Sequence, residues 1–218
     1  MIDFKRPVVQ VALDFQTIDE ALRVGEMAVK AGVDWVEAGT ILLYCAGCGA
    51  IGALARAFPD RPVLADFKTM DAGGRNVSLT HEQGGRLMTV CGNATDETIQ
   101  AATKVSRNTG VWVMIDTIGV RDQAGRVKQC VSWGANAIYL HYGFDQHQKD
   151  SSKDASQWLE EVKAVTTVPV GLASFDIKGA VAGVKRGADF VVIGHPLIST
   201  GDVFENLKKY VQEVKGAA

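Results

Sequence analysis

The stretch VLADFKTMDAGG, residues 63–74, joins an apolar run to a tight group of charges and a pair of glycines. The run Val-Leu-Ala has the character of a buried β-strand, and it ends at Asp66. Side chains two positions apart on a strand point to the same side, so Asp66 and Lys68 should face the same way, with Asp71 beyond the strand on a loop. A surface ion-pair cluster is the alternative, but clustered charges behind a buried strand favour a catalytic site.

Short apolar runs of the same kind recur along the whole chain. Each is bounded by Gly, Pro or polar residues, and most are rich in Val and Ile, which is typical of buried strands. The eight runs are VVQVALD (8–14), VDWVEA (33–38), PVLADF (62–67), RLMTVC (86–91), VWVMID (111–116), NAIYLH (136–141), VPVGLA (168–173) and DFVVIG (189–194).

Amphipathic stretches with helical spacing lie between these runs. In the stretch 17–32, Thr17 is followed three residues later by Glu20, which is the pattern of a capping box, and Gly32 marks the expected end of the helix. Three further stretches have the same helical character: ATDETIQAATKVSRNTG (94–110), DASQWLEEVKAVTT (154–167) and DVFENLKKYVQEVK (202–215).

Strands that alternate with helices at about 25 residues per unit indicate a parallel sheet. Eight such units match a (β/α)8 TIM barrel, and we expect one catalytic domain of this kind over residues 1–218. The alternative is an open, doubly wound α/β sheet. The first strand is not followed by the GxGxxG pattern that would support it, since the chain there reads VALDFQTID.

Composition excludes some classes of partner. The chain has 218 residues, 47% of them hydrophobic, and a formal charge of −2. Nucleic acids and anionic membranes attract strongly basic proteins, so neither is expected as a partner. No apolar stretch approaches the roughly 20 residues that span a bilayer. The stretch MIDFKRPVVQ (1–10) lacks the apolar segment of a secretory signal, so we expect a soluble cytoplasmic protein.

The four cysteines include a CxxC pair, Cys45 and Cys48, together with two isolated residues, Cys91 and Cys130. A structural zinc site normally needs a second pair of ligands, and a redox CxxC normally opens a helix of a thioredoxin-like unit. Neither context is present, so we expect reduced thiols.

In a TIM barrel the carboxyl-terminal ends of the strands form the active face. Five of the eight expected strands deliver an ionisable group there, and the residues are Asp14, Glu37, Asp66 with Lys68, Asp116 and His141. Carboxylates on both sides of Lys68 should keep it protonated, which suits a proton donor or an electrostatic anchor rather than a Schiff-base nucleophile.

The other members of this set have both functional and structural interpretations. Glu37 and Asp66 end neighbouring strands and suit Mg²⁺, although Glu37 alone also suits a salt bridge. His141 suits a general acid or base, or a hydrogen-bonded structural histidine. Asp14 would orient the lysine or the metal, and His81 and His147 are given no role. Together these groups suit enediolate chemistry, in which a divalent ion polarises a ketone and its neighbouring hydroxyl while a base removes a proton or CO₂ departs.

The pattern Asp66-x-Lys68-x-x-Asp71 resembles the orotidine 5′-monophosphate decarboxylase suprafamily. The chain is most similar to the branch that holds 3-hexulose-6-phosphate synthase and 3-keto-L-gulonate-6-phosphate decarboxylase. The matching segments follow the family order over nearly the whole chain: QVALD (10–14), VEAGT (36–40), VLADFKTMDAGG (63–74), TVCG (89–92), Asp116 and LHYGFDQ (140–146).

The resemblance implies an Mg²⁺ ion on Glu37 and Asp66, and proton transfers by Lys68, Asp71 and His141. Asp14 would belong to the same polar network. It also implies a homodimer in which Asp71 completes the neighbouring subunit's site, and a sugar phosphate as the substrate.

Three features favour the synthase, which would add formaldehyde to ribulose 5-phosphate. They are Met70 in DFKTMDAG, the H-x-G-x-D pattern with Phe144 where the decarboxylase carries arginine, and Asp116 where the decarboxylase usually has glutamate. The alternatives are 3-keto-L-gulonate-6-phosphate decarboxylase or a decarboxylase of a related acid, and a non-catalytic barrel that binds a sugar phosphate.

The turns expected to hold the phosphate depart from the family pattern, which has paired glycines after strand seven and a Gly-rich or Gly-Arg turn after strand eight. Here Ala173 replaces a glycine, and His195-Pro196 occupies the second turn. Ser174 and protonated His195 would donate to a phosphate, and an inward-facing Asp176 would repel it. The residues expected at this end are Gly171, Ala173, Ser174, Gly194 and His195.

Overall fold

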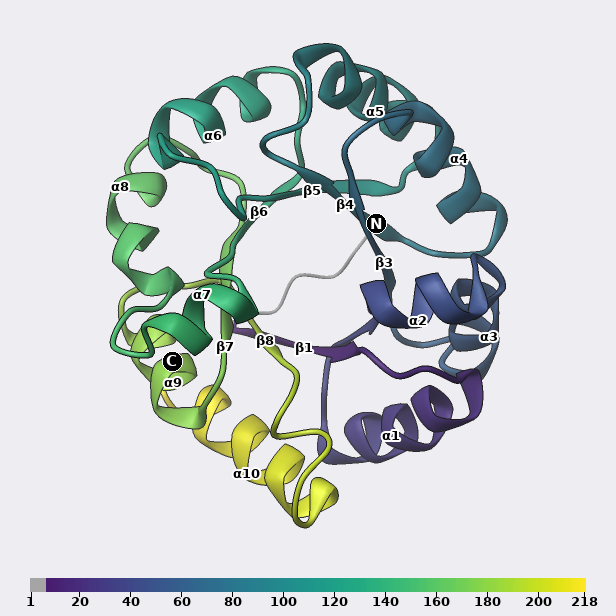
Figure 1. Ribbon diagram of the computed structural model, residues 1–218, viewed down its shortest axis with the longest axis vertical. Helices are drawn as coiled ribbons and strands as arrows, with labels where there is room; N and C mark the ends of the chain where they lie inside the picture. The colour runs from purple at the N-terminus through teal and green to yellow at the C-terminus, as the bar shows by residue number, and fades with distance from the viewer. Residues whose placement is uncertain (1–6) are drawn as a thin grey trace.

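The computed structural model describes residues 7–218. Residues 1–6 of the N-terminal stretch, which is expected to lack a secretory signal, lie outside the described part. Within residues 7–218, eight parallel strands close into a barrel in chain order, and helices surround it (Figure 1). The strands are β1 (Val8–Leu13), β2 (Trp35–Ala38), β3 (Val63–Thr69), β4 (Leu87–Cys91), β5 (Trp112–Asp116), β6 (Ala137–Leu140), β7 (Val170–Ser174) and β8 (Phe190–Ile193). The (β/α)8 barrel is therefore confirmed, with each predicted run forming one strand.

The four predicted helical stretches are also confirmed. They form α1 (Ile18–Ala31), α5 (Asp96–Thr109), the 3₁₀ turn η1 (Ala155–Trp158) with α8 (Leu159–Lys163), and α10 (Val203–Lys215). The described part contains six more helices: α2 (Thr40–Ala46), α3 (Gly49–Ala57), α4 (Gly73–Glu82), α6 (Gln123–Ser132), α7 (Phe144–Lys149) and α9 (Ile177–Lys185). These six are shorter than α1, α5 and α10, and several contain glycine, so their helical periodicity is weak in the sequence.

The ends of α1 follow from its sequence. The Oγ1 atom of Thr17 accepts a hydrogen bond from the backbone N–H of Glu20 at 3.2 Å, and the Thr17 hydroxyl donates to the Glu20 carboxylate at 2.9 Å. Gly32 ends the helix with a φ of 98°, a left-handed conformation that glycine adopts without steric cost.

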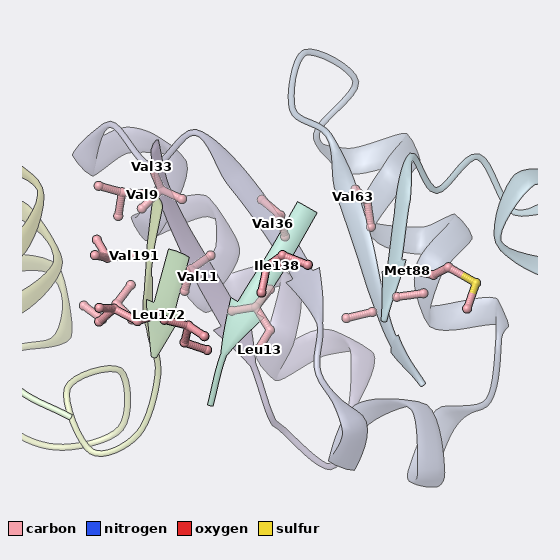
Figure 2. Packing of buried hydrophobic residues seen from close by; sticks show 14 of the residues in the cluster. Val9, Val11, Leu13, Val33, Val36, Val63, Met88, Ile138, Leu172 and Val191 are labelled. Atoms are coloured by element: carbon pink, nitrogen blue, oxygen red, sulfur yellow. The ribbon is translucent and has the colours of Figure 1, made fainter. Parts of the chain in front are cut away.

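Successive side chains along each strand point alternately out of and into the barrel, so the core has two layers. Side chains such as Val9, Val11 and Leu13 of β1 point outward and pack beneath the helices (Figure 2). The inward-facing side chains form a separate cluster that includes Trp35, Leu64, Leu87, Met114, Tyr139 and Phe190. These residues fill the lower interior of the barrel, so the inward positions above them, near the carboxyl ends of the strands, are left for the site.

The four cysteines are free; Cys91 and Cys130 are buried, and burial raises the pKa of these two thiols to about 12 and about 11. In the described part, no helix alone is long and apolar enough to cross a membrane. The pair α2 and α3, bent by 114°, meets that criterion by length and composition.

Candidate active site

A cavity of about 1250 Å³ opens at the carboxyl-terminal mouth of the barrel. It brings together most of the predicted site residues. Those that line it are Asp14, Glu37, Asp66, Lys68, His141, Ala173, Ser174, Gly194 and His195. Asp116 is fully buried against two of these residues, whereas Asp71 and Gly171 do not line the cavity.

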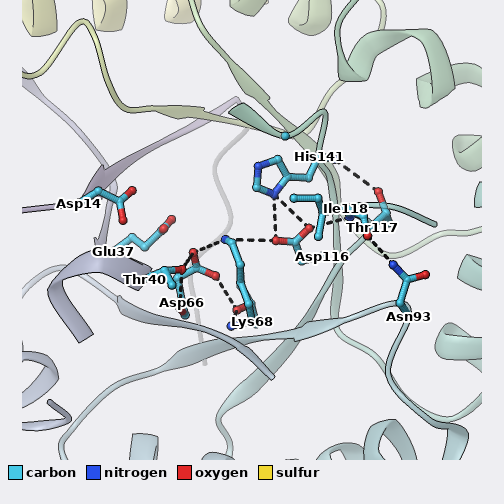
Figure 3. Close-up of polar contacts among 12 residues, drawn as sticks. Asp14, Glu37, Thr40, Asp66, Lys68, Asn93, Asp116, Thr117, Ile118 and His141 are labelled. Atoms are coloured by element: carbon cyan, nitrogen blue, oxygen red, sulfur yellow. Dashed lines mark hydrogen bonds and ion pairs between the residues drawn. The ribbon is translucent and has the colours of Figure 1, made fainter. Parts of the chain in front are cut away.

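Lys68 lies between two carboxylates (Figure 3). Its Nζ atom is 2.5 Å from Asp66 Oδ2 and 3.5 Å from Asp116 Oδ2. Burial alone would lower the pKa of Lys68, but Asp66, Asp116 and Glu37 outweigh it and raise the pKa above its ordinary value. The amine therefore stays protonated, as the sequence predicted. A protonated amine suits a proton donor or an anchor for negative charge rather than a nucleophile.

The backbone at Lys68 explains how β3 presents two charges to one cavity. The pairing of β3 with β4 shifts register between Ala65 and Thr69, and Lys68 has a φ of 43°. Non-glycine residues rarely adopt this left-handed conformation, and such strain is concentrated at functional sites. The N–H of Lys68 donates to Thr89 Oγ1 at 3.0 Å, which holds this irregular segment in place.

Asp66 is fixed by two threonines that the sequence analysis did not identify. Thr89 donates to Oδ1 and Thr40 to Oδ2, each at 2.7 Å. With Lys68 also bonded to Oδ2, both carboxylate oxygens have partners. The TVCG and VEAGT segments contain these threonines, and the inward position of Thr89 on β4 was the one available signal.

Asp116 and His141 form a second pair at the ends of adjacent strands. His141 Nδ1 lies 2.9 Å and 3.1 Å from the two carboxylate oxygens of Asp116. Burial opposes ionisation of Asp116, but His141, Lys68 and the N–H of Ile118 lower its pKa overall. An ionised carboxylate only accepts hydrogen bonds, so Nδ1 of His141 carries the proton and Nε2 remains a base.

Glu37 is in surroundings that oppose its negative charge. It is buried, and burial together with the neighbouring Asp66 and Asp14 raises its pKa well above the usual range. The amide of Gln10, fully buried on β1, donates to Glu37 Oε2 and holds the side chain. Glu37 is thus positioned by a residue that sequence reasoning missed.

Asp14 is held at the rim by α2. Its Oδ1 atom accepts from the N–H of Ile41 at 3.1 Å, while burial, and then the charge of Asp66, raise its pKa. Gly39 allows this approach, because a Cβ atom there would lie 2.4 Å from Asp14 Oδ1. The glycine of VEAGT therefore serves the packing of a site carboxylate.

The donor set suits a hard divalent cation. Asp14, Glu37 and Asp66 are oxygen donors whose mutual repulsion a cation would relieve, and oxygen is the ligand type that Mg²⁺ prefers. Among residues 7–218, no group of three or more His, Cys, Asp or Glu side chains is arranged to hold a metal ion. Two carboxylates supplemented by water or substrate oxygens fit the usual manner of Mg²⁺ binding.

Two predicted residues lie apart from the others. Asp71 is exposed, and its Oδ1 atom accepts from the N–H of Ala72 at 2.7 Å. Gly171 lies within β7, where a Cβ atom would stand 2.3 Å from the ring of Phe190. Gly171 therefore makes room for a core side chain inside the barrel instead of cradling a ligand.

The end of the cavity between β7 and β8 differs from a phosphate cradle. The carboxylate of Asp176 caps α9 by accepting from the N–H of Gly179 at 2.7 Å, so an acid occupies the helix N-terminus. Ser174 Oγ donates to the carbonyl of Asp176 at 2.6 Å. His195 bonds the carbonyl of Asp14 through Nε2 and Ser199 Oγ through Nδ1. Among the described residues that line the cavity, Lys68 is the sole Lys or Arg.

The short helix α7 lies inside the ring of helices and borders the mouth (Figure 1). Its residue His147, given no role from the sequence, stacks on Phe175 with 4.0 Å between ring centroids. Phe144, on the same helix, lies 6.5 Å from Phe175. These aromatic rings give the mouth an aromatic wall that the sequence did not predict.

Comparison with known proteins agrees with this geometry. Residues 7–210 match the model of the "Orotidine 5′-phosphate decarboxylase / HUMPS family". A 3-hexulose-6-phosphate synthase of Mycobacterium gastri is 34% identical over 196 residues, which cover 88% of this chain and 92% of that protein. One of Bacillus subtilis (strain 168) is 31% identical over 205 residues, which cover 93% and 96%. A crystal structure of 3-hexulose-6-phosphate synthase superposes with a TM-score of 0.87 and 30% identity, covering 96% of this chain and 99% of that one.

Proposed function

Because the chain belongs to the orotidine 5′-phosphate decarboxylase / HUMPS family, we propose that it is a Mg²⁺-dependent lyase that adds formaldehyde to ribulose 5-phosphate through an enediolate. The chain is a carbon–carbon lyase. One observation carries the proposal of this specific reaction. Asp116 contacts both His141 and Lys68, and Lys68 also contacts Asp66.

His141 is the base of this reaction. Asp116 accepts the Nδ1 proton, so Nε2 is free to take a proton from the substrate carbon next to the ketone. The positive charge that then forms on the imidazole is stabilised by the ionised Asp116 beneath it.

Lys68 provides a fixed positive charge beside the reacting atoms. Removal of the proton moves negative charge onto the substrate oxygens, and a preorganised cation in a cavity stabilises that charge. Asp66 and Asp116 keep the ammonium charged and hold it in place, with Thr40 and Thr89 holding Asp66 in turn.

Glu37 and Asp66 would hold the Mg²⁺ ion, with Asp14 beside them. When bound, the ion supplies Lewis-acid polarisation of the ketone and of its neighbouring hydroxyl. Burial, and then repulsion from Asp66 and Asp14, raise the pKa of Glu37; a bound cation would relieve that repulsion, which supports the assignment.

We also propose a homodimer in which Asp71 serves the neighbouring site. Two features support it: Asp71 lies outside the cavity of its own chain, and large apolar side chains are exposed on the adjoining segments. Tyr44 on α2 is 77% exposed, and Met70, next to Asp71, is 53% exposed. A dimer interface on this side would cover both of these exposed apolar side chains.

The test measures formaldehyde consumption and CO₂ release side by side. Purified protein with Mg²⁺ and ribulose 5-phosphate should consume formaldehyde, whereas release of CO₂ from 3-keto-L-gulonate 6-phosphate would indicate the decarboxylase instead. Lys68→Ala should abolish turnover without unfolding the protein, and Lys104→Ala, an exposed lysine on α5, is the matched control. Retained activity in Lys68→Ala would reject the assignment, and binding of sugar phosphate without any turnover would indicate a non-catalytic barrel.

A further inference from the structure

Tyr139 is an inward-facing residue of β6 that the mechanism above does not use. It lies two positions before His141 on the same face of the strand, and its ring packs against two neighbours. The centroid distances are 4.9 Å to His141 and 6.4 Å to Phe190. These contacts fix the plane of the phenol ring directly below the base.

The side chain forms part of the floor of the cavity. Tyr139 lines it together with Ala12, Ala173 and Val192. Because these three neighbours are small, the space above the phenol remains open to a ligand. Phe190 belongs to the same inward-facing cluster as Tyr139 but does not line the cavity.

The phenol hydroxyl has no hydrogen-bond partner among the side chains and backbone groups of residues 7–218. Tyr139 as a whole is 5% exposed, but its hydroxyl is not among the enclosed side-chain atoms that lack a partner, so it is open to the cavity, where a tyrosine hydroxyl usually finds a hydrogen-bond partner. A ligand oxygen in the cavity would supply the missing acceptor.

The surroundings keep this hydroxyl protonated. Burial, and then the charges of Glu37, Asp116, Asp66 and Asp14, raise the pKa of Tyr139 well above its usual value. A phenol held in its neutral form among carboxylates is a hydrogen-bond donor, and the carboxylates themselves can only accept.

We propose that the hydroxyl of Tyr139 donates a hydrogen bond to an oxygen of the bound substrate at the floor of the cavity. The Tyr139 hydroxyl would then donate to substrate oxygens alongside the ammonium of Lys68, in a cavity whose carboxylates can only accept. This inference rests on the proposed function, since it takes a hydroxylated ketose phosphate as the ligand.

The test compares Tyr139→Phe with a matched variant elsewhere in the barrel. Tyr210 on α10 is fully buried, and its hydroxyl also lacks a partner within residues 7–218, but it lies in the outer core. Tyr210→Phe therefore removes the same group without touching the cavity. Binding of ribulose 5-phosphate is measured by calorimetry with Mg²⁺, alongside kcat, KM and the midpoint of thermal unfolding.

Tyr139→Phe should weaken ribulose 5-phosphate binding about 3- to 10-fold or lower kcat about 100-fold, with an unfolding midpoint no lower than that of wild type. Tyr210→Phe should match wild type in binding and turnover. Unchanged binding and kcat in Tyr139→Phe would overturn the inference, as would a lower unfolding midpoint without any effect on the ligand. Failure of the wild-type protein to bind or convert the ketose phosphate would instead reject the proposed function, and this role with it.

Discussion

Oδ2 of Asp116 lies 2.9 Å from Nδ1 of His141, at the ends of adjacent strands. Asp116 is fully buried, and its position fixes both the orientation and the tautomer of the imidazole. The same carboxylate oxygen lies 3.5 Å from the ammonium of Lys68. One buried acid thus organises the base and the cation of the proposed reaction.

Asp116→Asn should lower kcat by about 100-fold or more, because an amide does not fix His141 in the basic tautomer or stabilise the imidazolium. Steady-state kinetics with ribulose 5-phosphate and formaldehyde measure the effect. Asp96→Asn, which alters the exposed ion pair with Arg126, is the control and should retain activity. Equal rates in the two variants would remove Asp116 from the mechanism.

Mg²⁺ should raise the unfolding midpoint more strongly as the pH increases. Burial, and then the charges of Asp66 and Asp14, raise the folded-state pKa of Glu37 above its ordinary value of 4.5. Its contribution to stability is therefore present below that value and is lost as the pH rises through the raised pKa. The cation binds the ionised form, so its stabilising effect grows over the same range.

Glu37→Gln tests the same site by removing the charge. The variant should be at least as stable as wild type without Mg²⁺ at neutral pH, and it should lose the Mg²⁺-dependent rise in the unfolding midpoint. Thermal scans with and without Mg²⁺ across pH give both results. A rise that persists undiminished in Glu37→Gln would place the cation elsewhere.

Asp176→Asn should lower the KM for ribulose 5-phosphate, because asparagine still caps a helix but no longer repels a phosphate group. Asp202→Asn is the matched control, since Asp202 caps α10 through the N–H of Glu205 and does not line the cavity. Its KM should not change. An equal KM in Asp176→Asn and wild type would show that the phosphate binds away from the N-terminus of α9.

Mixing two inactive variants tests the shared role of Asp71. If Asp71 serves the neighbouring subunit, a heterodimer of Asp71→Ala with Lys68→Ala contains one intact site, and the mixture should regain up to about half of the wild-type activity per heterodimer. The assay follows formaldehyde consumption after the subunits are mixed and re-equilibrated. Full activity of Asp71→Ala alone would show that this aspartate is dispensable.

The barrel was predictable because its eight strands are short, apolar and separated by regular intervals. The position of the candidate site groups was predictable for the same reason, since Asp116 and His141 stand at strand ends and Lys68 follows a buried run. What the strand pattern could not supply is the irregular backbone at Lys68, where the register of β3 shifts. That feature depends on bonds from β4, far along the sequence.

The supporting polar residues were less visible. Thr40, Thr89 and Gln10 have ordinary roles elsewhere in proteins, and their function here depends on partners that other strands bring to them. Gly171 is the opposite case, because the turn sequence predicted a ligand-binding role for it that the structure does not support. The close approach of Phe190 across the barrel explains that glycine instead.

Exchange of substrate hydrogen with solvent tests the proposed chemistry most directly. In D₂O with Mg²⁺ and without formaldehyde, the protein should replace one hydrogen of ribulose 5-phosphate, on the terminal hydroxyl-bearing carbon next to the ketone, with deuterium. Proton NMR follows the loss of that signal, which should be about 100-fold slower or absent in His141→Ala. No exchange by an active wild-type enzyme, or undiminished exchange by His141→Ala, would contradict an enediolate formed by this base.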